Sequence, residues 1–168
     1  MGVLSREVNF VQNPALGAAL LFNCAASYVS SNLSNSPMPI PLLYLVLPIV
    51  LHEETGKIIS STQQNSGLRL AVSKFSDSSI GKNDLLLSIH NRALIMRDLT
   101  TRSLAVAVAK RLLTIDVQSA CVIPFAVNIP NSKISRPVSN LYKSSTKLGF
   151  WFSNLTLQEI TITLKIAL

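Results

Sequence analysis

The run of apolar residues from Pro41 to Leu51 constrains this chain more than any other feature, because it must be buried against something. It stops abruptly at His52, after which come two glutamates and Thr55. A helix that crosses a bilayer needs about 20 apolar residues, and this run is shorter and is interrupted by Pro48. The segment is therefore predicted to be a helix or a strand in the core of a soluble domain.

The composition predicts a subunit that works with a partner. The chain has 168 residues, enough for one domain with its own core. Apolar residues make up 48% of it and charged residues only 14%, which leaves more apolar surface than a small soluble protein usually exposes. Three parts of the single domain are expected, at 9–75, 82–127 and 138–168.

The charge balance favours anionic partners. Lys and Arg number 15 against 8 Asp and Glu, giving a net charge of +7, which suits nucleic acid or acidic protein surfaces. Cys24 and Cys121 lie in separate apolar stretches and are predicted to be core residues of a protein in a reducing compartment. The first residues do not form a leader pattern, so a cytoplasmic location is expected.

The N-terminal part is predicted to be helical. Asn13 and Pro14 form a helix start, and the helix is expected to run to about Tyr28, before a polar loop at 29–37. A polar stretch over 56–64 is expected to separate the apolar run from a short helix at 66–75.

The middle part predicts two helices and a hairpin. Asn83 or Asp84 is expected to cap the first helix and Thr100 the second, which covers 101–112. The second helix is predicted to bury Leu104, Ala105, Val108 and Leu112 and to expose Arg102, Ser103 and Lys110. Two β-rich runs at 113–117 and 120–127 follow, joined by a polar turn. Helix, turn, helix and hairpin is the order of a winged helix.

The last part is expected to contain a loop at 128–137 and a helix at 138–152, and the tail from 156 to 168 fits either a helix or a strand. The predicted fold class is therefore α+β and mostly α. A winged-helix-like helix-turn-helix with its β-hairpin is joined by additional packed N- and C-terminal helices.

Several separated segments together resemble one family, the middle component of three-component ABC systems, which includes the small subunit of Lamassu-type defence systems. The matching segments are Asn13-Pro14-Ala15, the run from Leu42 to His52 with Thr55, Arg92, Leu99-Thr100-Thr101-Arg102, Leu112 to Ile115, Leu148-Gly149 and Trp151-Phe152. Two positions depart from the family pattern, where Gly56 replaces an expected Arg and Ser60 an expected Pro.

The resemblance implies an adaptor that joins an SMC-like or Rad50-like ABC ATPase to an effector, such as a nuclease, in a bacterial complex that acts against phages or plasmids. DNA is expected to be contacted through the complex, and no membrane is expected as a partner. The residues predicted to meet a partner protein are Leu42, Tyr44, Leu45, His52, Thr55, Val106 and Trp151.

No catalytic, cofactor or metal site is predicted. His52 begins a sequence similar to a zinc-protease motif, but Gly56 stands where the second histidine belongs. His52 is instead expected to meet the negative end of the apolar helix or to bond a backbone carbonyl there. His90 has no carboxylate or cysteine partner in the sequence, and the glycines form no phosphate-binding loop. The chain is therefore predicted not to be an enzyme.

Basic residues of the middle part are the candidates for contact with nucleic acid or an acidic partner: Arg92, Arg97, Arg102, Lys110 and Arg111. If the second helix faced a DNA groove, Arg102 and Lys110 would meet phosphates or bases. Val106 with its flanking alanines suits a protein interface at least as well, and a solvated face is a third interpretation. A second basic stretch, from Lys133 to Lys147, is expected to be a solvated surface.

Two alternative functions stay open. A free-standing winged-helix regulator would bind duplex DNA as a homodimer. A small hydrolytic or metal enzyme would require the fold to bring partners to His52 or His90.

Overall fold

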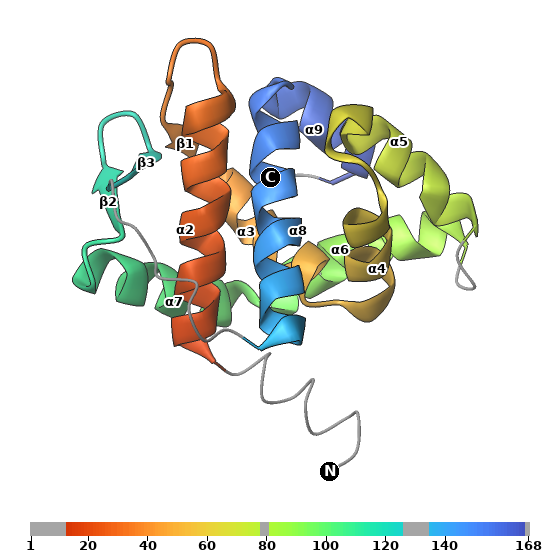
Figure 1. Ribbon diagram of the computed structural model, residues 1–168, viewed down its shortest axis with the longest axis horizontal. Coiled ribbons are helices and arrows are strands. Elements are labelled where there is room, and N and C mark those ends of the chain that lie inside the picture. The colour runs from red at the N-terminus through yellow and green to blue at the C-terminus, as the bar shows by residue number, and fades with distance from the viewer. Residues whose placement is uncertain (1–12, 78–80, 126–134, 167–168) are drawn as a thin grey trace.

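Two long helices lie side by side at the centre of the molecule and run in the same direction (Figure 1). The computed structural model describes residues 13–77, 81–125 and 135–166. The first long helix is α2 (Pro14–Ser31) and the second is α8 (Arg136–Ser153). Asn13 caps α2 as predicted, because its side chain accepts hydrogen bonds from the backbone N–H groups of Ala15 and Leu16.

The contact between α2 and α8 requires small residues. A Cβ atom on Gly149 would lie 2.1 Å from the carbonyl oxygen of Cys24, so only glycine permits this spacing. One turn earlier on α8, the hydroxyl of Ser145 donates to the carbonyl oxygen of Leu20. Leu148, Trp151 and Phe152 of α8 are buried beside this crossing.

The apolar run forms helix α3 (Ile40–Val50), which contains Pro48 and is almost entirely buried. Helix α4 (Glu53–Ser61) follows it and includes most of the stretch that was expected to be polar. Glu53 and Glu54 occupy the first turn of α4, where the positive end of the helix dipole favours them. The 3₁₀ turn η1 (Gln64–Ser66) leads into α5 (Gly67–Ser73), which confirms the short helix predicted at 66–75.

The middle part contains the elements that were predicted, with shifted boundaries. After the 3₁₀ turn η2 (Lys74–Asp77), helix α6 (Lys82–Ile95) begins after Gly81 rather than at a cap by Asn83 or Asp84. Helix α7 (Arg97–Ala109) begins one turn earlier than predicted, so Thr100 lies inside the helix and is fully buried instead of capping it.

The buried side of α7 also differs from the prediction. Ser103 and Ala107 are fully buried, whereas Ala105 and Val108, expected in the core, are exposed. The reason is the close crossing of α7 with α2, where a Cβ atom on Gly17 would lie 2.1 Å from the hydroxyl oxygen of Ser103. The side of α7 with small side chains is the one that packs against α2, because only small side chains permit the two helices to lie so close.

A three-stranded antiparallel sheet lies beside α2 and α7 (Figure 1). Strands β2 (Leu113–Asp116) and β3 (Cys121–Pro124) form the predicted hairpin, with Ile115 opposite Val122. The third strand, β1 (Met38–Pro39), was not predicted, and it pairs with β3 from far upstream in the sequence. The strand order is therefore β1-β3-β2.

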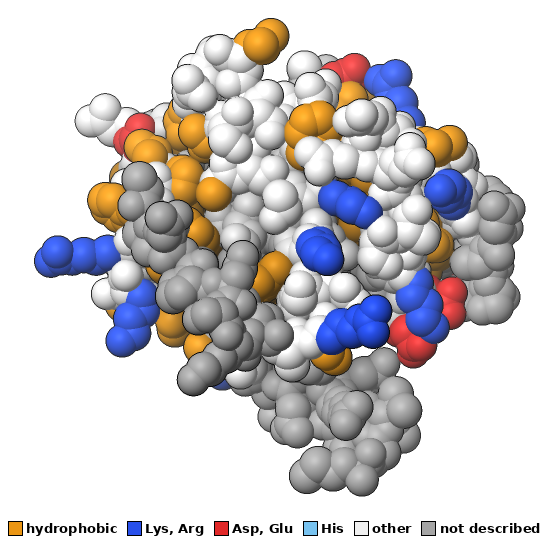
Figure 2. Space-filling view, in the orientation of Figure 1, with side chains coloured by type: hydrophobic (Ala, Val, Ile, Leu, Met, Phe, Trp, Pro, Cys, Tyr) orange, Lys and Arg blue, Asp and Glu red, His pale blue; other side chains and the backbone are white. Residues whose placement is uncertain are grey.

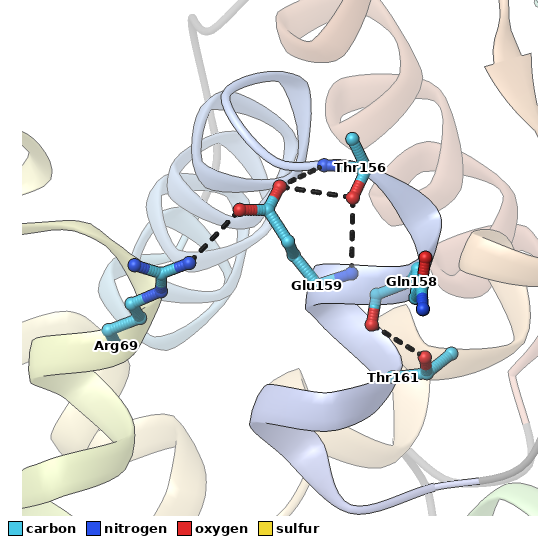
Figure 3. Close-up of polar contacts among 5 residues, drawn as sticks. All are labelled: Arg69, Thr156, Gln158, Glu159 and Thr161. Atoms are coloured by element: carbon cyan, nitrogen blue, oxygen red, sulfur yellow. Dashed lines mark hydrogen bonds and ion pairs between the residues drawn. The ribbon is translucent and has the colours of Figure 1, made fainter.

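The tail forms helix α9 (Leu157–Leu164), which resolves the choice between helix and strand for its described part. A capping box explains its start, since Thr156 and Glu159 each bond the other's backbone N–H (Figure 3). The same Glu159 carboxylate lies 3.0 Å from Arg69 Nη2, which links α9 to α5 (Figure 3). The structure thus confirms a mixed α+β fold that is mostly α. Of the loop predicted at 128–137, residues 128–134 lie outside the described residues.

Candidate functional site: uncovered apolar surface

The hairpin and the end of α7 expose large apolar side chains. Val117, in the turn of the hairpin, is 84% exposed, and four other apolar residues nearby are also exposed. We define the hairpin surface as Val108, Ile115, Val117, Ile123 and Phe125. Figure 2 shows apolar side chains gathered on the side of the molecule where α7 and the hairpin lie. Several large apolar side chains exposed on neighbouring elements are typical of a protein interaction site.

The strand pairing explains why apolar side chains appear on both faces of the hairpin. Ile115 shares a face with buried Val122, whereas Ile123 points to the opposite face because side chains alternate along a strand. In a strand with one face buried and one in water, apolar residues occur at every second position. The apolar residues of this hairpin occupy both kinds of position, and this pattern in the sequence could have identified the surface. Strand β2 is also an edge of the sheet.

Two basic residues adjoin the hairpin surface at the end of α7. Lys110 and Arg111 are both exposed, and Arg111 adopts a left-handed backbone conformation with φ of 55° where the chain turns into β2. Arg102, further back along α7, is exposed but forms an ion pair with Asp98 at 2.8 Å.

The other two basic candidates lie elsewhere, so the five do not form one cluster. Arg97 is at the start of α7, which at 13 residues is about 20 Å long. Arg92 points inward, where its Nε donates to the carbonyl oxygen of Pro48 at 3.1 Å and its Nη1 bonds Ser88 Oγ at 3.0 Å. Burial lowers the pKa of Arg92 to about 10, which leaves it charged at neutral pH.

Lys147 has a similar structural role, although it was expected to belong to a solvated face. Its ammonium group donates to the carbonyl oxygens of Ile59, Ser60 and Thr62, at 3.2, 2.7 and 2.8 Å. These carbonyls belong to the end of α4, where a positive charge is favourable. Burial lowers the pKa of Lys147, and the positive charges of Lys143 and Lys74 lower it further. Lys133, from the same basic stretch, lies outside the described residues.

The corner between α3 and α4 is held by two of the predicted interface residues. Thr55 is fully buried, and its hydroxyl donates to the carbonyl oxygen of Ile49 at 2.6 Å. His52 caps α4, because its Nδ1 accepts from the backbone N–H of Thr55 at 3.4 Å. The expectation that His52 meets the negative end of α3 is therefore wrong: its side chain faces the positive start of the next helix.

Burial lowers the pKa of His52, and the charge of Arg92 lowers it further. The negative charges of Glu54 and Glu53 raise this pKa, but their effect is smaller. The imidazole is therefore neutral at pH 7, as an acceptor for a backbone N–H must be.

The remaining interface candidates separate by burial. Leu42, Leu45 and Trp151 are at most 1% exposed, so they belong to the chain's own core. The Trp151 indole N–H donates to the carbonyl oxygen of Gln64 at 2.6 Å, which fixes η1 against α8. Tyr44 and Val106 are partly exposed. Tyr44 lines a groove between α3 and α6, and its hydroxyl bonds Thr101 Oγ1 at 3.1 Å.

The two histidines lie in different parts of the described structure. No group of three or more His, Cys, Asp or Glu there could hold a metal ion. His90 lines the groove between α3 and α6, and His52 lies in the corner between α3 and α4. Cys24 is buried as predicted, and burial raises the pKa of its thiol, while Cys121 is partly exposed. None of the described helices is long and apolar enough to cross a membrane.

The fold and this surface define a small, mainly helical subunit with apolar area left uncovered. The comparisons with known proteins place it more narrowly. The family model of the ABC-three component (ABC-3C) system Middle Component 3 matches residues 1–168, so the chain belongs to this family. No curated protein and no solved structure matches it.

Proposed function

We propose that this chain is a non-catalytic adaptor subunit that joins an SMC-like or Rad50-like ABC ATPase to an effector, such as a nuclease. Membership of a middle-component family means that the chain works with partner proteins. The identity of those partners, and a role in Lamassu-type defence against phages or plasmids in the cytoplasm, are parts of the proposal.

The observation that carries the proposal is the hairpin surface. Its five large apolar side chains are exposed although the chain has a well-filled core around α2, α3 and α8. Lys110 and Arg111 beside it suit an acidic rim on the partner. An interface with an apolar centre and charged edges is the usual form of a specific protein contact.

An adaptor transmits a signal only if it binds one conformation of the ATPase more tightly than another. The hairpin surface suits this role, because it projects from the compact body of the helices (Figure 1). A change in the ATPase surface that contacts the hairpin would change the affinity, and thereby the state of the effector that the complex holds.

The test is co-purification of the full chain with the ATPase and the effector encoded beside it. A double variant, Ile123→Glu with Phe125→Glu, should reduce the affinity for one of these components at least tenfold. The control is Ile162→Glu, at an apolar position on α9 that is more exposed than either of these residues. Binding that is unchanged in the double variant, with its circular dichroism spectrum intact, would remove the hairpin surface as the contact.

A free-standing DNA-binding regulator is the second candidate, favoured by the net charge of +7 and the order helix, helix, hairpin. The exposed side of α7 argues against it. This side contains small apolar residues such as Ala105 and Ala109, and its Arg102 is neutralised by Asp98. On the face that Figure 2 shows, basic side chains lie at several places, some of them far from α7 and the hairpin.

A further inference from the structure

Helix α6 carries apolar side chains on two opposite sides. Leu85, Leu86 and Ile89 are buried against the core. On the outer side, Leu94 is 61% exposed and Ile95 is 79% exposed, and Leu87 two turns earlier is exposed as well. Large apolar side chains that stay exposed on the outer side of a helix are typical of a surface that another element or a partner covers. The outer side of α6 therefore lacks a covering element among the described residues.

A groove runs beside this uncovered side, between α3 and α6. It has a volume of about 360 Å³ and is lined mainly by apolar groups. Helix α3 contributes Tyr44 and Leu45, helix α6 contributes Ala93 and Leu94, and Ile166 also lines the groove. The Tyr44 hydroxyl already bonds Thr101 Oγ1. A molecule bound in the groove would therefore contact mainly apolar groups.

The polar groups at the groove are His90 and Arg97. Among the described residues, no ion pair or hydrogen bond involves the Arg97 guanidinium, and the neighbouring Asp98 is paired with Arg102. None of the described residues that line the groove is acidic. The charge at its rim therefore complements an acidic group on whatever binds there.

We propose that this groove binds an amphipathic helix of a partner subunit. One apolar side chain of that helix occupies the groove, others cover Leu94 and Ile95, and an acidic side chain about one turn away pairs with Arg97. This inference rests on the adaptor function proposed above and adds a second contact, on α6 rather than on the hairpin.

Two other occupants fit the surface less well. A small ligand would fill the groove but leave the apolar side chains of α6 that lie outside it exposed. A second copy of this chain would bring together two surfaces that are both basic at the rim, each on a chain of net charge +7. An acidic amphipathic helix satisfies both the shape and the charge.

The test measures binding of the full chain to the ATPase and to the effector encoded beside it, each taken alone. Leu94→Asp should weaken binding to one of them at least tenfold, and Arg97→Glu should weaken the same one. Arg97→Lys should restore most of the affinity, and added salt should reduce the difference between Lys and Glu at this position. Because Leu94 and Arg97 are exposed, the variants should unfold at the wild-type temperature.

The outcomes separate the two proposals, with Ile162→Asp as the control for an exposed apolar position elsewhere. If the hairpin variant disrupts binding and both groove variants do not, the inference about the groove fails and the adaptor function stands. If the wild-type chain binds neither component, the proposed adaptor function is wrong. The proposal that the groove binds a partner helix is then wrong as well. A wild-type dimer that Leu94→Asp converts to a monomer would show that the occupant is a second copy.

Discussion

At the scale of single residues, the conspicuous polar side chains of this protein end or begin helices. His52 begins α4, Lys147 ends it, and Arg92 bonds the carbonyl of Pro48 near the end of α3. Each supplies a partner to a backbone group that a helix end leaves unpaired. Histidine and basic residues that resemble a functional site in the sequence therefore stabilise the fold.

His52 should make stability depend on pH. Its pKa in the folded chain is below its ordinary value of 6.5, so the unfolded state binds a proton first as the pH falls. This contribution to the free energy of unfolding is complete above pH 6.5 and is lost as the pH falls through the lowered pKa. His52→Asn, which can still cap α4, should therefore show a smaller loss of stability from pH 7 to 5 in urea titrations. Equal losses in both proteins would contradict this role.

Lys147→Met should lower the free energy of unfolding by about 1–2 kcal/mol, because three carbonyl groups at the end of α4 lose a charged donor. Lys143→Met is the matched control on the same helix, since Lys143 is exposed and its charge lowers the pKa of Lys147. It should leave stability unchanged or slightly higher in thermal and urea unfolding. Equal effects of the two changes would show that Lys147 acts only through net charge.

At the scale of elements, the fold depends on two close helix crossings. Gly149 lets α8 approach the Cys24 carbonyl on α2, and Gly17 lets α2 approach Ser103 on α7. Helices packed at such distances exclude side chains larger than glycine or serine from the contact. The Leu148-Gly149 and Trp151-Phe152 segments, which contribute to the resemblance seen in the sequence, have a structural role: they pack α8 against α2 and η1.

Gly149→Ala tests the first crossing. Alanine favours a helix by up to about 1 kcal/mol over glycine, but its Cβ would meet a backbone oxygen that cannot move independently. The net result should be a loss of about 2–3 kcal/mol in the free energy of unfolding. Thr146→Ala, at an exposed position of the same helix, should change stability by less than about 1 kcal/mol. Stability at or above the wild-type value in Gly149→Ala would show that the crossing can relax.

At the scale of the whole molecule, the net charge of +7 is spread over separate places. Arg92 and Lys147 are bound to backbone carbonyls, and Arg102, Arg69 and Lys57 form ion pairs with carboxylates. Lys110 and Arg111 form an exposed pair of basic residues at one end of α7. Two neighbouring charges support weak contact with phosphates rather than recognition of a base sequence.

The isolated chain should therefore bind duplex DNA weakly and without sequence preference. Because each phosphate contact contributes close to one unit to the slope of log affinity against log salt, a slope of about 2 or less is expected in fluorescence anisotropy titrations. Replacing Lys110 and Arg111 by Gln should abolish this binding. Tight binding to one sequence, with a steep salt dependence, would instead support the free-standing regulator.

Local signals predicted a large part of this fold. The start of α2 at Asn13 and Pro14, the hairpin, and helix α8 follow from caps, turns and periodicities that involve only neighbouring residues. The burial of the run at 41–51 could also be predicted, because a helix formed by these residues is apolar on all its sides. The excess of apolar residues also predicted uncovered surface.

What the local pattern could not show depends on residues far apart in the sequence. Helix α4 ends on Lys147 from α8, strand β1 pairs with β3, and the buried side of α7 is chosen by Gly17. The same holds for the candidate sites, since burial put Leu42, Leu45 and Trp151 in the core and left Leu94 and Phe125 outside. Neighbours in the chain set whether a segment can form a helix or a strand, whereas close packing between distant segments decides which of its sides is covered.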